Sequence, residues 1–153
     1  MTTALGMPGL RTRLEPSPAD PALGLVDSFG RRAADLRISL TDKCNLRCTY
    51  CMPAEGMDWR PSSELLTAAE IQRLVRIGVQ RLGIVELRLT GGEPLIRPDL
   101  EEIIAGVHRE HPELPISLTT NAIGLDRRAA GLRAAGLTPV SYTHLTLPTT
   151  PYV

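Results

Sequence analysis

The chain has 153 residues, which is enough for one modest domain, and its 17 basic residues balance its 17 acidic ones. A formal net charge of zero gives no electrostatic argument for a nucleic-acid partner or a membrane surface. The sequence has no apolar run of membrane-spanning length and no apolar signal core at its N-terminus, so we expect a cytoplasmic protein.

The first part of the chain is predicted to lie outside the folded core. Residues 1–25 contain four prolines and few large apolar side chains, which is typical of a flexible arm. Residues 26–31 follow, with a turn centred on Gly30, and favour a small hairpin.

Three later segments alternate between apolar and polar side chains and are therefore predicted to be strands. They span residues 35–41, 84–90 and 115–121. A helix follows each strand. The first starts at a capping box formed by Thr67 and Glu70 and stops at Gly83. The second starts at Pro98, and the third spans 127–135 with Asp126 as its cap.

This strand–helix alternation predicts an α/β fold with a parallel sheet. Each strand has one apolar and one polar face, although strands of parallel sheets are normally apolar on both. One interpretation is a curved sheet whose polar side lines a wet, ligand-filled cavity, and the alternative is a solvated face. We favour the cavity because three successive strands show the same split.

All three cysteines, Cys44, Cys48 and Cys51, lie within eight residues directly after the first predicted strand. An odd number cannot all pair as disulfides, and this spacing suits three thiolates on an iron–sulfur cluster with one iron left open. Two alternatives stay open at this point. A zinc site is one, although it usually takes four protein ligands, and three unrelated buried cysteines are the other.

Two further features lie near the same predicted rim. Gly91 and Gly92 directly follow the second strand, at a place where a ligand could approach the backbone closely. Arg37 and Arg88 lie on the polar strand faces and favour an anionic ligand such as a phosphate or carboxylate. The alternative for Arg88 is an internal ion pair with Glu86 or Glu93.

These residues resemble the radical SAM (S-adenosylmethionine) superfamily. The resemblance depends on the Cys-x-x-x-Cys-x-x-Cys motif at 44–51 and on Gly-Gly-Glu-Pro at 91–94. Within the superfamily, the sequence is more similar to the GTP 3′,8-cyclases of molybdenum-cofactor biosynthesis, which are lyases. The similarity covers residues 26–137, and its supporting segments are 27–31, 36–45, 50–57, 65–67, 87–95 and 118–121.

The resemblance implies a set of cofactors and ligand contacts. Cys44, Cys48 and Cys51 would bind a [4Fe–4S] cluster whose open iron takes SAM. Tyr50 and Gly92 would contact SAM, whereas GTP would meet Arg37, Arg88 and Thr119. Cleavage of SAM would give a 5′-deoxyadenosyl radical that starts the cyclisation of GTP to (8S)-3′,8-cyclo-7,8-dihydroguanosine 5′-triphosphate. An electron donor such as flavodoxin or ferredoxin is expected, as is a homodimer of the full-length protein.

The chain also departs from this family. It supplies about three strand–helix units of a partial (β/α) barrel, and it lacks the cysteines of the family's second [4Fe–4S] cluster. We therefore expect an incomplete chain that does not complete the reaction alone. Residues 138–153 contain no charged residue and resemble a translated library-preparation adapter. We interpret them as a non-native tail and give His144 no role. Alternative functions are a peptide-maturing radical SAM enzyme and a non-catalytic metal-binding module.

Overall fold

The computed structural model describes residues 24–48, 50–51, 58–138 and 141–142. Most of the expected arm, residues 1–23, and most of the expected tail lie outside the described residues. The predicted hairpin is confirmed: β1 (Leu25–Val26) pairs antiparallel with β2 (Arg32–Ala33). Strand β1 begins at Leu25, inside the segment expected to be the arm.

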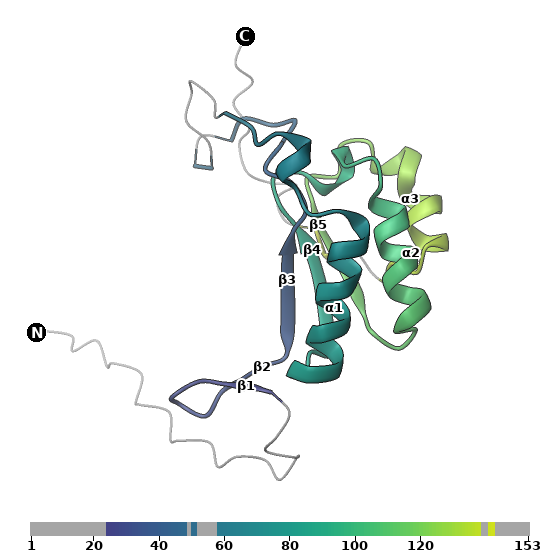
Figure 1. Ribbon diagram of the computed structural model, residues 1–153. Coiled ribbons are helices and arrows are strands. Elements are labelled where there is room, and N and C mark those ends of the chain that lie inside the picture. The colour runs from purple at the N-terminus through teal and green to yellow at the C-terminus, as the bar shows by residue number, and fades with distance from the viewer. Residues whose placement is uncertain (1–23, 49, 52–57, 139–140, 143–153) are drawn as a thin grey trace, which may run out of the picture.

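A parallel sheet with three covering helices forms the folded core, as Figure 1 shows. Its strands lie in chain order, and each of the first three is followed by a helix, which confirms the predicted α/β class. The strands are β3 (Asp35–Ser39), β4 (Glu86–Thr90), β5 (Ile116–Thr120) and β6 (Ser141–Tyr142). The helices are α1 (Ala68–Leu82), α2 (Leu100–Glu110) and α3 (Leu125–Ala134), with short 3-10 turns η1 (Ser62–Glu64) and η2 (Pro94–Ile96).

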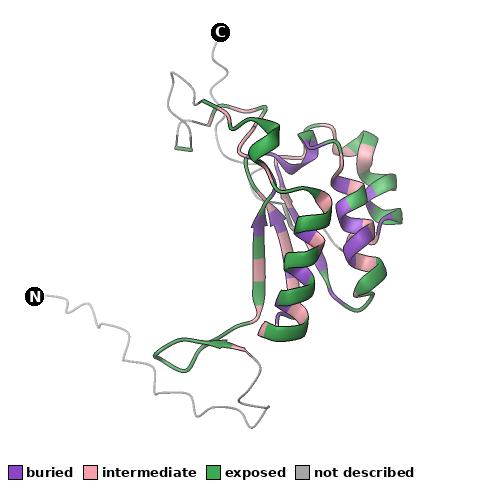
Figure 2. Cartoon of the chain, in the orientation of Figure 1, coloured by how far each residue is buried: buried purple, intermediate pink, exposed green. Residues whose placement is uncertain are grey.

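All three helices cover the same face of the sheet, and the core lies between these two layers (Figure 2). The strand residues on this face are apolar, and Leu87, Leu89, Ile116 and Leu118 are fully buried. Burying each such side chain contributes about 1.5–3 kcal/mol before entropic costs. The helices therefore pack against the apolar strand face that the alternation of apolar and polar residues predicted. The helix side of the core consists mainly of Ile71, Val75, Leu100, Ile103, Ile104, Val107 and Leu132.

The helix starts agree with the predictions only in part. Thr67 and Glu70 form the expected capping box of α1, and Gly83 ends this helix in the left-handed conformation. The predicted start of α2 at Pro98 is wrong: the helix begins at Leu100, after a turn. The predicted cap at Asp126 is also wrong, because Gly124 precedes α3 and Asp126 lies within its first turn.

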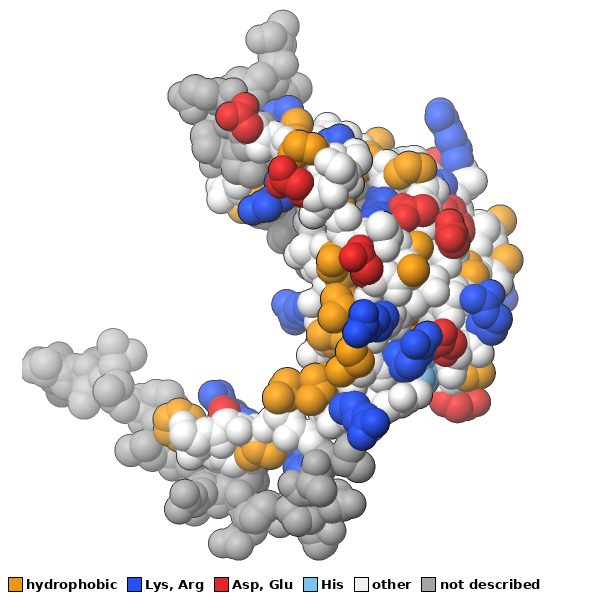
Figure 3. Space-filling view, in the orientation of Figure 1, with side chains coloured by type: hydrophobic (Ala, Val, Ile, Leu, Met, Phe, Trp, Pro, Cys, Tyr) orange, Lys and Arg blue, Asp and Glu red, His pale blue; other side chains and the backbone are white. Residues whose placement is uncertain are grey.

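The opposite face of the sheet is polar, and none of the helices in the described part of the chain covers it. Arg37 of β3 is in register with Arg88 of β4, which is in register with Ser117 of β5. Figure 3 shows a hollow between the hairpin and the loops at the far end of the sheet. On the polar strand faces, Arg37 and Ser39 of β3 are both exposed.

Candidate metal centre

Three loops meet where the parallel strands end. The cysteine segment follows β3, the Gly-Gly turn follows β4, and Thr120 ends β5. The first two loops are joined through their backbones. The N–H of Gly92 donates to the carbonyl of Thr41 at 2.7 Å, and the N–H of Glu93 donates to the carbonyl of Lys43 at 2.8 Å. The chain is therefore fixed to the sheet up to the residue before Cys44.

The Gly-Gly turn is constrained by this close approach. A Cβ on Gly92 would overlap the carbonyl oxygens of Lys43 and Asp42, and Gly91 has a φ of 138° that also brings it against Thr41. Because the N–H of Gly92 is already bonded to Thr41, its remaining backbone group for a ligand is the carbonyl oxygen. Glycine at positions 91 and 92 is therefore needed mainly because the turn after β4 packs directly against the segment after β3.

The three cysteines are free thiols on one loop. Cys44 and Cys48 are half-buried and Cys51 is exposed. The N–H of Cys51 donates to the carbonyl of Cys48 at 2.9 Å, and the N–H of Leu46 donates to Sγ of Cys44 at 3.4 Å. The part of the chain that the structure describes holds no ready-made group of three metal-binding side chains. The donor set nevertheless fits an iron–sulfur cluster by its chemistry, and metal binding itself draws such ligands together.

Tyr50 lies among these thiols. Desolvation, then a hydrogen bond with Cys48 and the charges of Cys48, Cys51 and Cys44, raise the pKa of its phenol. The hydrogen bond places the phenol of Tyr50 beside Cys48.

Sequence reasoning named Glu93 only as a possible partner of Arg88, which instead pairs with Glu86, and missed that the buried Glu93 carboxylate joins the loops after β4 and β5. Its side chain is 1% exposed and accepts three hydrogen bonds. The N–H of Leu95 donates to it at 2.9 Å, the hydroxyl of Thr120 at 2.7 Å and the N–H of Asn121 at 2.7 Å. The one available signal was an acid between a Gly-Gly turn and a proline, a position that caps η2.

Sequence reasoning also missed Arg97, which connects two segments next to the cysteine loop. Its guanidinium, 9% exposed, donates to the carbonyls of Leu40 and Leu66 at 2.7 Å each and forms a two-bond ion pair with Asp99. It thereby fixes the end of β3 to the loop before α1. Because its carboxylate is held by Arg97, Asp99 occupies the N-cap position of α2 without making a side-chain cap hydrogen bond.

The residues predicted to contact GTP lie on the polar face of the sheet. Arg37 and Arg88 are neighbours in register, and Thr119 is half-buried on β5. The ion pair between Arg88 and Glu86, the alternative considered from the sequence, is formed: a guanidinium nitrogen lies 3.1 Å from the Glu86 carboxylate. The same nitrogen lies 3.7 Å from the carboxylate of Asp35. The Nε of Arg88 is buried and has no hydrogen-bond partner among the described residues, so this N–H is one donor that could meet a ligand.

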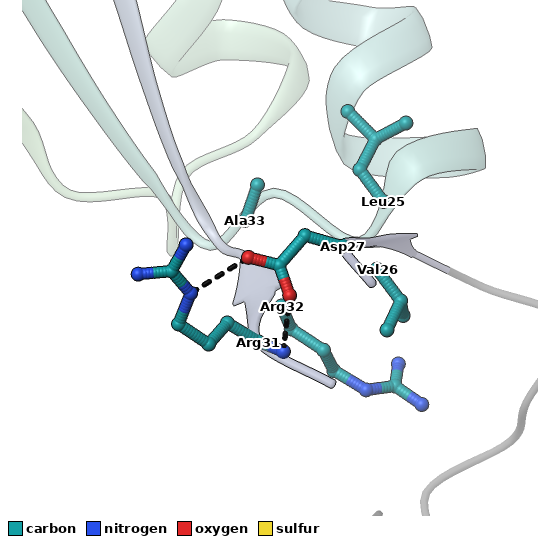
Figure 4. Close-up of a pocket in the computed structure, with 6 residues that line it drawn as sticks. All are labelled: Leu25, Val26, Asp27, Arg31, Arg32 and Ala33. Carbon is teal, nitrogen blue, oxygen red and sulfur yellow. Dashed lines mark hydrogen bonds and ion pairs between the residues drawn. The ribbon is translucent and has the colours of Figure 1, made fainter. Parts of the chain in front are cut away.

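A cavity of about 480 Å³ lies elsewhere, against the β1–β2 hairpin at the opposite end of the sheet (Figure 4). Leu25, Val26 and Ala33 supply its apolar side, and Asp27 with Arg31 forms an ion pair at its edge. None of the predicted site residues lines this cavity.

None of the described helices is long and apolar enough to cross a membrane.

Comparisons with known proteins match the sequence over most of its length. The chain is 63% identical over 124 residues to the GTP 3′,8-cyclase of Paenarthrobacter nicotinovorans, which covers 81% of this chain and 35% of the relative. It is 56% identical over 143 residues to the GTP 3′,8-cyclase of Mycobacterium marinum, which covers 91% of this chain and 40% of the relative. The chain thus spans 35–40% of the length of these relatives.

The fold comparison agrees with these matches. The crystal structure of BtrN in complex with AdoMet and 2-DOIA superposes with a TM-score of 0.56 and 17% identity, covering 70% of this chain and 44% of that one. Residues 38–150 match the family model of the radical SAM superfamily, a range that includes part of the expected tail. With its three thiols at the end of the first core strand of a parallel sheet, the chain belongs to the radical SAM superfamily.

Proposed function

We propose that this chain is the N-terminal part of a GTP 3′,8-cyclase, which catalyses the first step of molybdenum-cofactor biosynthesis. The observation that carries the proposal is the 63% identity to a curated cyclase across 81% of the chain. The polar face supports it, because cationic side chains follow one another on the strands that end at the thiols. In the longer protein, the three strand–helix units extend into a partial (β/α) barrel with a second [4Fe–4S] cluster beyond this segment.

Membership of the superfamily implies a [4Fe–4S] cluster and SAM as cofactors. Cys44, Cys48 and Cys51 are the proposed cluster ligands. When bound, the cluster and SAM supply an electron and a 5′-deoxyadenosyl radical for hydrogen abstraction from the substrate. Tyr50 packs beside this site. Gly92 would offer its carbonyl oxygen to the amino group of SAM, since its N–H is bonded to Thr41.

GTP is the proposed substrate, bound along the polar face of the sheet. Arg37 and Arg88 neutralise its phosphates, and the half-buried hydroxyl of Thr119 accepts or donates a hydrogen bond nearer the rim. The ion pair with Glu86 orients Arg88 and leaves Nε available to the nucleotide. Reduction by a flavodoxin or ferredoxin, a cytoplasmic location and a homodimer of the full-length protein belong to the same proposal.

Two experiments test this function. The chain is first reconstituted anaerobically with iron and sulfide, and we expect a brown protein that binds SAM. A chimera then tests the reaction, with residues 26–137 of this chain replacing the matching segment of the Paenarthrobacter relative. We expect 5′-deoxyadenosine that carries deuterium from GTP labelled at C3′. A chimera that cleaves SAM without taking up this deuterium would contradict GTP as substrate and leave the superfamily chemistry intact.

A further inference from the structure

We propose that the hydrogen bond between Asn45 and Asn121 is a positioning contact for the metal centre. The side-chain nitrogen of Asn121 donates to the side-chain oxygen of Asn45 at 2.8 Å, across 76 residues of sequence. Asn45 directly follows the first cysteine ligand, and Asn121 directly follows β5. The bond therefore ties the segment that holds Cys44 to a strand that does not adjoin β3 in the sheet.

The orientation of Asn121 is determined by its other partners. Its backbone N–H donates to the buried carboxylate of Glu93 at 2.7 Å, and its side-chain oxygen accepts from the N–H of Ile123 at 3.0 Å. A backbone N–H can only donate, so the oxygen of this amide must face Ile123 and the nitrogen must face Asn45. Contacts within its own turn and to Glu93 therefore fix the direction of the Asn121 side-chain NH₂ group, independently of Asn45.

The backbone after Asn121 is shaped to keep this geometry. Ala122 has a φ of 65°, which is uncommon for a residue other than glycine. Its N–H donates to the hydroxyl of Thr120 at 3.0 Å, and that hydroxyl in turn donates to Glu93. The turn therefore brings the N–H of Ile123 back onto the side chain of Asn121, so that Asn121 forms a rigid anchor.

The cysteine segment itself has few other fixed points. The bonds of Gly92 and Glu93 to the segment end at Lys43, and Arg47 donates to the carbonyl of Cys44 at 3.2 Å while its guanidinium stacks on Trp59. Among the described residues of this loop, Asn45 makes the contact that reaches β5. Loss of that contact would free the first ligand to move relative to the Gly-Gly turn, where SAM is proposed to bind.

The test compares N45D, N121D and the double variant in the full chain, reconstituted anaerobically with iron and sulfide. Each single variant leaves one amide that can donate to a carboxylate, so we expect iron release to a chelator within about twofold of the parent. The double variant places two acceptors face to face, and we expect release at least about tenfold faster. The single variants also control for placing a negative charge beside the thiols or beside Glu93.

A second readout needs no metal. In the apo chain, we expect the double variant to lose amide hydrogen-exchange protection at residues 44–48, with an unchanged urea midpoint, whereas both single variants keep it. Additive effects of the two substitutions on both readouts would overturn the inference. So would a double variant whose protection falls equally across the whole sheet, because that result indicates a general loss of stability.

The inference rests on the cluster assignment but not on GTP. A parent chain that takes up no iron overturns both the cluster and this role. A parent chain that binds iron, with variants that show no coupling, overturns this role alone and leaves the proposed function standing.

Discussion

The hydroxyl of Thr120 donates a hydrogen bond of 2.7 Å to the carboxylate of Glu93, which lies 27 residues earlier in the chain. Both side chains are buried, at 4% and 1% exposed. The bond joins the end of β5 to the turn after β4, directly beside the cysteine segment. A buried carboxylate is tolerated here because two backbone N–H groups and this hydroxyl satisfy its oxygens.

The first prediction concerns this carboxylate. Glu93→Gln replaces one acceptor oxygen with an NH₂ group, which would face the N–H of Asn121. Two opposed donors in a buried site should cost about 2 kcal/mol in the free energy of unfolding, measured by urea denaturation. Glu113→Gln removes the same charge from an exposed position and should change the stability little. Equal midpoints for the two variants would contradict the role assigned to Glu93.

The second prediction concerns the close contact of the Gly-Gly turn. Gly92→Ala should push the cysteine segment away, cost about 1–3 kcal/mol in unfolding free energy and reduce the iron bound per chain. Gly131→Ala is the matched control, because this glycine is exposed in α3 with only ordinary contact to Glu101. That control should gain up to ~1 kcal/mol. Normal iron content in Gly92→Ala would show that the two loops need not touch so closely.

The third prediction tests the cluster ligands. Cys48→Ala in the reconstituted chimera should abolish SAM cleavage, because two thiolates cannot replace three at a cubane with one open iron. The two measurements are production of 5′-deoxyadenosine by the chimera and the visible absorption of the reconstituted chain itself, which holds none of the cysteines proposed for the second cluster. The N-terminal hairpin offers a control in Asp27→Asn, whose partners lie at the opposite end of the sheet and which should keep both signals. SAM cleavage by Cys48→Ala would remove this residue from the ligand set.

The fourth prediction tests the polar face. Arg88→Ala should weaken GTP binding by about tenfold or more in the chimera, since a charge-assisted hydrogen bond contributes ~1.5–3 kcal/mol. Its iron content should stay unchanged. Arg76→Ala also breaks an ion pair, with Glu110 at 2.6 Å, but on the helix side of the sheet. Isothermal titration with GTP should separate the two variants, and equal affinities would argue against nucleotide binding along the polar face.

The fifth prediction concerns acid pH. Hydrogen bonds from Arg97 lower the pKa of Asp99 below 3.8, and hydrogen bonds from Arg128 lower that of Glu101 below 4.5. Groups with a depressed folded pKa contribute stability that is present above their unfolded pKa and lost as the pH falls through the folded value. The free energy of unfolding should therefore be steady near neutral pH and fall below about pH 4.5.

The matched variant for this acid effect is the double substitution D99N and E101Q. Urea denaturation as a function of pH should give it a shallower decline than the parent below pH 4.5. A decline as steep as that of the parent would show that other carboxylates dominate the acid unfolding.

Much of the fold follows from local pattern in the sequence. The alternation in residues 84–90 predicts which side chains of β4 face the helices, and the structure buries Leu87 and Leu89 as expected. Thr67 and Glu70 predict the start of α1 because a capping box closes within four residues. The spacing of the three cysteines likewise indicates a shared metal site, since three ligands on one short loop can reach the same centre.

Contacts between distant segments could be decided only by the tertiary structure. The bonds of Glu93 to Thr120 and Asn121, the bond between Asn45 and Asn121, and the bond of Arg97 to Leu40 each span between 27 and 76 residues. Strand order and register determine which loops meet, and neither leaves a periodic mark on the side chains involved. The pairing of Asp99 with Arg97, which leaves the N-cap of α2 without a side-chain hydrogen bond, is likewise a feature that only the structure reveals. The local sequence therefore determined the helices, the strands and the cysteine motif. The packing of the parallel strands determined which distant residues contact the loops around the three thiols.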